Sequence, residues 1–89
     1  MRIDKFLQLS GIIPRRTRAK ETCTRGLVIL NERTAKPSAS VSVGDRLDVT
    51  LGRRRSVYEI LLIPTRPMRK QNRGDAAELL ESETLTDDT

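Results

Sequence analysis

Apolar residues near the start of the chain recur at helical spacing and predict two short helices. Within residues 3–13 the apolar positions fall on one arc at about 100° per residue: Ile3, Phe6, Leu7 and Ile13. Pro14 closes this first segment, since the residue before a proline avoids helical geometry. A second helix is predicted over residues 16–25, with a narrow stripe of small residues and with Gly26 as its left-handed stop.

After Gly26 the pattern changes to that of β-strands. Four short strands are predicted, at residues 27–31, 33–36, 46–51 and 56–63. The first two are joined by a turn at Asn31-Glu32 and the last two by the basic segment of residues 52–55. A Gly44-Asp45 turn precedes the third strand. We therefore expect an α+β domain, with two or three short helices packed on a small antiparallel sheet.

The last quarter of the chain is polar and divides into a basic and an acidic part. Residues 65–74 form a basic connector, and residues 75–89 hold six acidic residues and no basic one. One or two helical turns are predicted around Ala76 to Leu80, followed by a partly disordered acidic tail. The expected organisation is one domain at residues 1–64 and a C-terminal extension at residues 65–89.

Charge is distributed unevenly along the chain. Residues 1–74 hold all 17 Lys and Arg residues against six of the 12 acidic residues, a net charge of +11, whereas the whole chain carries +5. Self-repulsion of that size destabilises a small fold and favours a polyanionic partner. An acidic membrane surface is the weaker alternative, because the sequence has no long apolar segment.

Cysteine and histidine usage narrows the chemistry further. The single Cys23 cannot form an internal disulfide, which fits a reducing cytoplasm, and its small side chain predicts a core position. The chain has no histidine, so zinc sites and histidine-based catalysis are nearly excluded. Asp4 and Lys5 interrupt any secretory signal. We therefore expect a cytoplasmic protein that is not an enzyme and needs no metal or cofactor.

The second predicted helix carries the densest cluster of cations. Arg16 and Lys20 lie on one flank of its apolar stripe, without an acidic residue beside them in that helix. On the other flank, Glu21 is spaced to pair with Arg18 and Arg25. Neighbouring segments add further cations: Arg2, Lys5, Arg33 and Lys36. A surface of one sign suits a phosphate backbone, which arginine binds in a bidentate manner and where counterion release drives binding.

The kind of nucleic acid follows from what the chain lacks. Phe6 and Tyr58 are its only aromatic residues, so single-strand binding by base stacking is disfavoured and folded RNA is the better match. A DNA-reading helix-turn-helix is the competitor, but the second helix has no Asn or Gln to read bases and a β-rich half follows. Residues 53–55 are either a solvated turn or a second, weaker phosphate contact.

The chain resembles a known RNA-binding module in three segments: RIDKFLQLSGIIPRRTRAKETCTRGLVILN, KPS and VGDRLDV. This is the module named after ribosomal protein S4, also called the αL motif, and the match covers about residues 1–52. The resemblance implies two helices packed on a small sheet, with RNA bound along the basic helices and the adjacent β turn. Two residues depart from the family pattern: Glu32 replaces a turn glycine, and Arg15 replaces a capping serine.

Among free-standing members, the chain most resembles the RqcP family and, more distantly, the heat shock protein fifteen family. The resemblance implies a non-catalytic, cytoplasmic factor of ribosome-associated quality control. Such a factor would bind ribosomal RNA of the large subunit and tRNA on obstructed large subunits, beside RqcH, and assist C-terminal tailing of stalled chains. We expect a monomer. The expected central contacts are Arg2, Lys5, Arg16 and Lys20, and the expected peripheral contacts are Arg15, Thr17, Arg18, Asn31 and Lys36.

Three alternatives remain open at this point. The chain could be a general RNA-binding ribosome or heat-shock factor, or an adaptor whose acidic tail or basic face docks a protein. The third alternative is that the acidic tail folds over the basic surface of the domain and mimics RNA.

Overall fold

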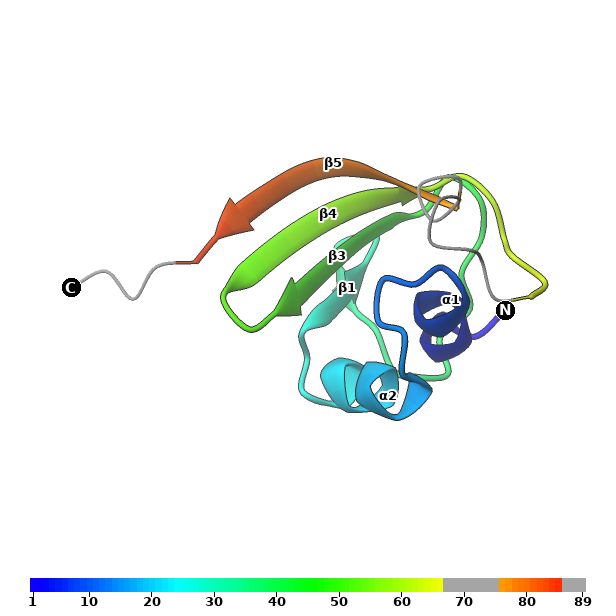
Figure 1. Ribbon diagram of the computed structural model, residues 1–89, viewed down its shortest axis with the longest axis horizontal. Coiled ribbons are helices and arrows are strands. Elements are labelled where there is room, and N and C mark those ends of the chain that lie inside the picture. The colour runs from blue at the N-terminus through cyan, green and yellow to red at the C-terminus, as the bar shows by residue number, and fades with distance from the viewer. Residues whose placement is uncertain (67–75, 86–89) are drawn as a thin grey trace.

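The protein is built on one antiparallel sheet, with two helices against part of one face (Figure 1). The computed structural model describes residues 1–66 and 76–85. The helices and strands follow one another in this order: α1 (Ile3–Leu9), α2 (Arg16–Thr24), β1 (Val28–Leu30), β2 (Arg33–Thr34), β3 (Arg46–Leu51), β4 (Arg54–Ile60) and β5 (Ala77–Thr84). The strand order in the sheet is β2-β1-β3-β4-β5, and every neighbouring pair is antiparallel. The predicted α+β fold of helices on a small antiparallel sheet is confirmed.

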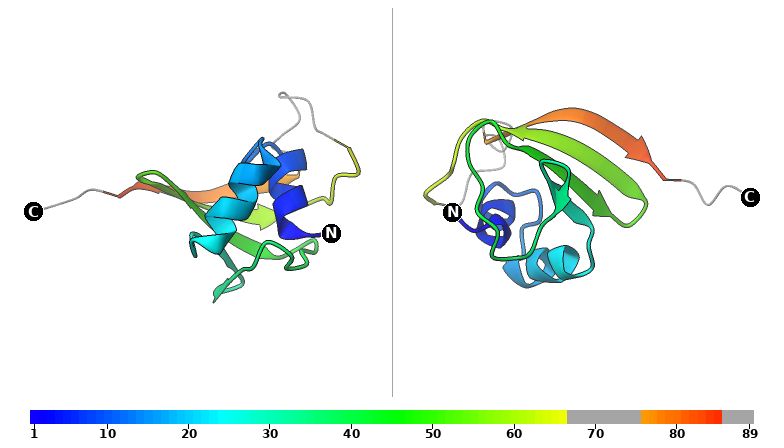
Figure 2. Two further views of the ribbon diagram at one scale, coloured as in Figure 1. Left: turned by 90° about the horizontal axis from the view of Figure 1, so that it is seen from below. Right: turned by 180° about the vertical axis from the view of Figure 1, so that it is seen from behind.

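The core lies between the two helices and the middle of the sheet (Figures 1 and 2). The apolar stripe of α1 is fully buried at Ile3, Phe6 and Leu7, and β3 supplies Leu47 and Val49 from the sheet. Helix α2 contributes only small buried side chains, which allow its backbone to lie close to α1. In the described part of the chain, no helix is long and apolar enough to cross a membrane.

Both helices end close to a glycine in the left-handed conformation. Helix α1 ends at Leu9, four residues before the predicted limit, and Gly11 follows with φ of +82°. Ile13 nevertheless returns to the core and is 2% exposed. Helix α2 ends at Thr24, and Gly26 has φ of +77°, so the predicted stop at Gly26 is confirmed. Arg15 precedes α2 without a side-chain cap, as its replacement of a serine suggests.

The β1–β2 turn holds two non-glycine residues in an unusual backbone conformation. Asn31 and Glu32 have φ of +49° and +71°. Positive φ at both central residues is typical of a type I′ turn, whose twist matches that of a hairpin and which favours glycine at its second position. The tight turn is therefore formed, and Glu32 carries the conformational cost of the missing glycine.

The β3–β4 turn is shorter than the predicted basic segment of residues 52–55. Arg54 and Arg55 already belong to β4, where they pair with Leu51 and Thr50. The Arg55 guanidinium binds the Asp48 carboxylate at 2.6 Å and reaches Glu83 at 3.3 Å. The hydrogen bond with Asp48 raises the pKa of Arg55. One of the three arginines therefore holds strands together instead of lying at the tip of the turn.

The predicted helical turns around Ala76 to Leu80 are wrong, because this segment forms strand β5. The strand pairs with β4 from Ala77 opposite Ile60 to Thr84 opposite Arg54. Ala76 and Ala77 are buried and fix the start of β5 to the core. The pairing satisfies backbone groups of β4 that would otherwise lie at an open edge. Residues 67–75 of the predicted connector and 86–89 of the predicted tail lie outside the described residues.

Candidate nucleic-acid interface

A buried carboxylate joins the two helices at the predicted basic surface. The side chain of Asp4 is fully buried, and it accepts hydrogen bonds from Nε and Nη2 of Arg2 at 3.2 and 3.1 Å. The backbone N–H of Lys5 donates to Oδ1 of Asp4 at 2.7 Å. From α2, Nη2 of Arg16 lies 3.6 Å from the same oxygen. A carboxylate removed from water requires partners of this kind, and we call Arg2, Asp4 and Arg16 the Asp4 cluster.

The Asp4 cluster corrects one prediction about α2. Arg16 was expected to lack a counter-charge, and Asp4 supplies one. A comparison of residues within one helix cannot detect this partner, because Asp4 lies on α1. The Arg2 and Arg16 side chains nevertheless remain 49% and 38% exposed. Both guanidinium groups are therefore anchored on a buried carboxylate and still accessible from solvent.

Arg16 is held less completely than Arg2. Its contact with Asp4 is an ion pair at 3.6 Å, which is longer than a hydrogen bond. Its Nε is buried and has no hydrogen-bond partner among the described residues. An unsatisfied buried donor costs about 1–3 kcal/mol, so this nitrogen does not help to anchor Arg16.

Three lysines extend the Asp4 cluster. Lys20 is exposed one helical turn after Arg16, and Lys5 is exposed directly after Asp4. The loop of residues 36–41 is bonded to the start of α1, as shown by the 2.7 Å hydrogen bond from the N–H of Ile3 to the carbonyl of Ala39. This loop brings Lys36 to the same end of α1. We use the term basic face for the five cations Arg2, Lys5, Arg16, Lys20 and Lys36.

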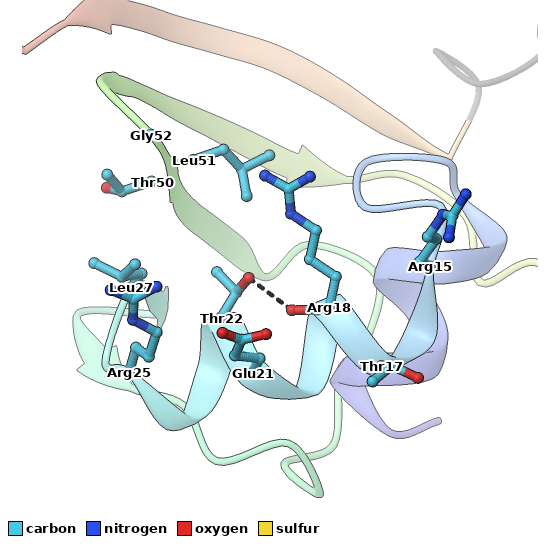
Figure 3. Close-up of a pocket in the computed structure, with 10 residues that line it drawn as sticks. All are labelled: Arg15, Thr17, Arg18, Glu21, Thr22, Arg25, Leu27, Thr50, Leu51 and Gly52. Carbon is cyan, nitrogen blue, oxygen red and sulfur yellow. Dashed lines mark hydrogen bonds between the residues drawn. The ribbon is translucent and has the colours of Figure 1, made fainter.

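The other flank of α2 faces a groove (Figure 3). The groove has a volume of about 630 Å³ and lies between α2 and the β3–β4 turn. It is lined by Arg15, Thr17, Arg18, Glu21, Thr22, Arg25, Leu27, Thr50, Leu51 and Gly52. The structure thus separates three of the predicted peripheral contacts, Arg15, Thr17 and Arg18, from Arg16 and Lys20, which do not line the groove.

The predicted pairing of Glu21 with Arg18 and Arg25 is wrong. Within the described residues, neither arginine has a nitrogen within 4.0 Å of the Glu21 carboxylate. Arg18 extends across the groove toward Leu51 (Figure 3), and Arg25 directly follows the last residue of α2. An exposed ion pair is only slightly more stable than the same two side chains separately solvated by water. Favourable spacing along a helix is therefore not enough to make such a pair form.

Asn31 has a structural role at the β1–β2 turn. Its Nδ2 donates to Oδ1 of Asp45 at 3.1 Å, and its Oδ1 accepts a hydrogen bond from the backbone N–H of Arg46 at 2.9 Å. Both ends of the amide are therefore engaged within the protein. Its role as a peripheral RNA contact stays a prediction.

Cys23 occupies the predicted core position between the helices. It is 2% exposed and belongs to the main cluster of buried apolar residues. Burial, and after it the negative charge of Asp4, raises the pKa of the thiol to about 11. Cys23 is thus a neutral packing residue at physiological pH. Among the described residues, no group of three or more His, Cys, Asp or Glu side chains could hold a metal ion.

The architecture and the N-terminal sequence together decide the family. A family model described as the S4 domain matches residues 1–47, which is more than half of the chain. The chain belongs to the S4 domain family. The resemblance inferred from the sequence motifs is confirmed, and the Asp4 cluster lies entirely within the matched S4 domain residues.

The chain is also similar to individual proteins over nearly its full length. An RQC P-site tRNA stabilizing factor of Halalkalibacterium halodurans is 35% identical over 86 residues, which cover 97% of each chain. A protein of the same name from Helicobacter pylori strain J99 is 46% identical over 65 residues, covering 73% of this S4 domain chain and 77% of the relative.

Two solved structures share the fold of this S4 domain protein. Heat Shock Protein 15 of Vibrio cholerae, described as trimeric, superposes with a TM-score of 0.83 and 24% identity over 89% of this chain and 80% of that chain. The solution structure of hypothetical protein HP1423 has a TM-score of 0.76 and 34% identity over 93% of this chain and 100% of that chain. Each superposition covers more of the chain than the S4 domain match at residues 1–47, so the shared architecture extends beyond that match.

Proposed function

We propose that this chain is a non-catalytic RNA-binding factor of ribosome-associated quality control. Its basic face would bind ribosomal RNA and tRNA on obstructed large ribosomal subunits. The Asp4 cluster is the observation that carries this proposal, because a fully buried carboxylate holds two partly exposed guanidinium groups side by side. The membership of the S4 domain family and the similarity to RQC P-site tRNA stabilizing factors support it.

The geometry of the basic face suits phosphate binding. Arg2 is fixed by two hydrogen bonds to Asp4, so little side-chain entropy remains to be lost when it meets RNA. The Arg16 side chain is 38% exposed and is held only by a long ion pair, so its guanidinium group can also bind a phosphate. The exposed lysines add positive charge and do not require a particular orientation of the phosphate. The release of counterions from the RNA drives the binding. In this proposal Arg2, Lys5, Arg16 and Lys20 are the central contacts, with Lys36 beside them.

The proposed role is positional. The basic face would hold tRNA and ribosomal RNA in place, and the C-terminal tailing of stalled chains would be performed by other components, with RqcH as the expected partner. We propose that the protein acts in the cytoplasm and as a monomer. No bond is made or broken by its own side chains in this scheme.

Sedimentation of the tagged protein with ribosomal fractions tests the proposal. Enrichment on large subunits that carry peptidyl-tRNA is the expected result, and enrichment on small subunits would contradict it. The double variant Arg2→Ala/Arg16→Ala should lose this enrichment. Arg46→Ala should keep it, because Arg46 lines a different surface with Asp48 and Glu81 on the open face of the sheet.

Strand β5 favours a protein-docking role as a second candidate function. It is the last strand of the sheet in the described part of the chain, and it exposes Leu79, Leu80 and several glutamates. Replacing both Glu78 and Glu81 by Lys distinguishes the two functions. If β5 docks a basic protein, ribosome association is lost while affinity for naked RNA is retained or increased.

A further inference from the structure

The groove on the far flank of α2 combines three kinds of chemistry that the basic face does not explain. Leu27 and Leu51 supply an apolar lining. Three arginines, Arg15, Arg18 and Arg25, place cations around it. The single acidic lining residue is Glu21, which is exposed and has no ion pair with Arg18 or Arg25. The volume of about 630 Å³ lies within the range of roughly 300–1,000 Å³ that is typical of small-molecule sites.

This composition limits what the groove can hold. A bare phosphate or an acidic peptide would match the arginines but would meet the Glu21 carboxylate, which repels it. An uncharged apolar group would leave four charged side chains without partners. A ligand that suits all three kinds of group has a flat ring, an attached phosphate and N–H donors directed at Glu21. A nucleotide of RNA has this combination.

The carboxylate of Glu21 would also discriminate among the four bases. An ionised carboxylate only accepts hydrogen bonds and has two oxygens side by side. The Watson–Crick edge of guanine presents two adjacent donors, N1–H and the 2-amino group, which match those oxygens. Adenine and cytosine present one amino group on that edge beside an acceptor nitrogen, and uracil presents one N–H between two carbonyl groups. Guanine is therefore the base that a single carboxylate binds best.

We propose that this groove receives one unstacked guanine nucleotide of a bound RNA. Glu21 would bind the Watson–Crick edge of the base, and Arg18, which extends over the groove toward Leu51, would stack on it (Figure 3). Unstacked bases in RNA complexes stack on arginine planes as well as on aromatic rings, and this chain has no aromatic residue in the groove. Arg15 and Arg25 would bind the adjoining phosphates. The inference rests on the proposed RNA-binding function.

Titration of a stem-loop RNA with one bulged nucleotide tests the proposal. The bulge is guanosine, inosine or uridine; inosine keeps N1–H and lacks only the 2-amino group. We expect the inosine RNA to bind about 3–10-fold more weakly than the guanosine RNA, as one lost hydrogen bond at a solvent-open site predicts. In Glu21→Gln this ratio should fall below about twofold, because a neutral amide has only one acceptor oxygen.

Glu32→Gln is the matched control, since it removes the same charge at an exposed site on the β1–β2 turn. It should keep the full preference for guanosine over inosine. Arg18→Lys keeps the charge and loses the planar group, so it should weaken binding of the guanosine RNA more than of the uridine RNA. Circular dichroism of each variant confirms that it is folded.

The outcomes separate this inference from the function on which it rests. Equal affinity for all three RNAs, with a steep salt dependence, would overturn the guanine site and leave RNA binding intact. A guanosine preference that is unchanged in Glu21→Gln would also overturn it. Absence of binding to any of the RNAs would contradict the proposed function as well.

Discussion

Asp4 connects the two helices through charge, at a position that the apolar pattern of α1 does not reveal. The residue lies among the buried positions of that helix, and its carboxylate is satisfied by Arg2, Lys5 and Arg16. Removing one member of a buried ion pair is costlier than removing an exposed one, because the remaining group is left without a partner. Asp4 therefore matters for stability and for where the two arginines point.

Asp4→Asn tests this role. The variant keeps the size of the side chain and loses the charge that holds both guanidinium groups. The free energy of unfolding should fall by about 1–3 kcal/mol, less than for a fully buried pair because both arginines are partly exposed. Urea denaturation measures this change, with Glu32→Gln as an exposed control. An unfolding free energy equal to that of the unmodified protein would contradict the account.

Cys23 predicts a pH dependence of stability on the alkaline side. The folded-state pKa of the thiol is raised from 9.0 to about 11, so its contribution is fully present below pH 9 and is lost as the pH rises through 11. The loss amounts to about 2–3 kcal/mol over these two pH units. Denaturation of the protein and of Cys23→Ala at pH 8 and pH 10.5 measures most of this loss, about 2 kcal/mol. Equal pH dependence in both proteins would show that other groups are responsible.

At the scale of helices and strands, the sequence predicts those elements whose formation depends on residues close together in the chain. The two helices, the Gly26 stop and the first two hairpins follow from apolar spacing and from turn residues close in sequence. Strand β5 was predicted as helix, because its segment AELLESET suits either structure and pairing with β4 decides. The same reason applies to the site. Asp4 and Arg16 come from different elements, and only the packing of α1 on α2 shows that they meet.

The β1–β2 turn supplies a test at this scale. Glu32→Gly should raise the free energy of unfolding by about 0.5–1 kcal/mol, because glycine adopts a φ of +71° without the steric cost of a Cβ atom. Urea denaturation is the measurement. Glu32→Ala removes the same charge but keeps the Cβ atom, so it should not stabilise the protein. Equal stabilisation by both substitutions would assign the effect to charge.

At the scale of the whole molecule, charge is divided between two surfaces. The basic face belongs to α1, α2 and the adjoining loop. Strand pairing, with a β-bulge in the β4–β5 pair between Val57 and Tyr58, places more acidic than basic side chains on the opposite, helix-free face of the sheet. The acidic ones are Asp48, Glu59, Glu78, Glu81 and Glu83, and the basic ones are Arg46 and Arg55. Such a dipolar molecule is attracted to RNA in one orientation and repelled in the other. We infer that the open face of the sheet points away from bound phosphates.

The salt dependence of binding to structured ribosomal RNA or tRNA tests the central claim, that the basic face binds phosphates. The logarithm of the affinity should fall steeply with the logarithm of the salt concentration. Arg16→Ala combined with Lys20→Ala should lower that slope by up to about two phosphate equivalents. Arg46→Ala, on the open face of the sheet, should leave it unchanged. A slope that is the same in the double variant and in the unmodified protein would contradict the account.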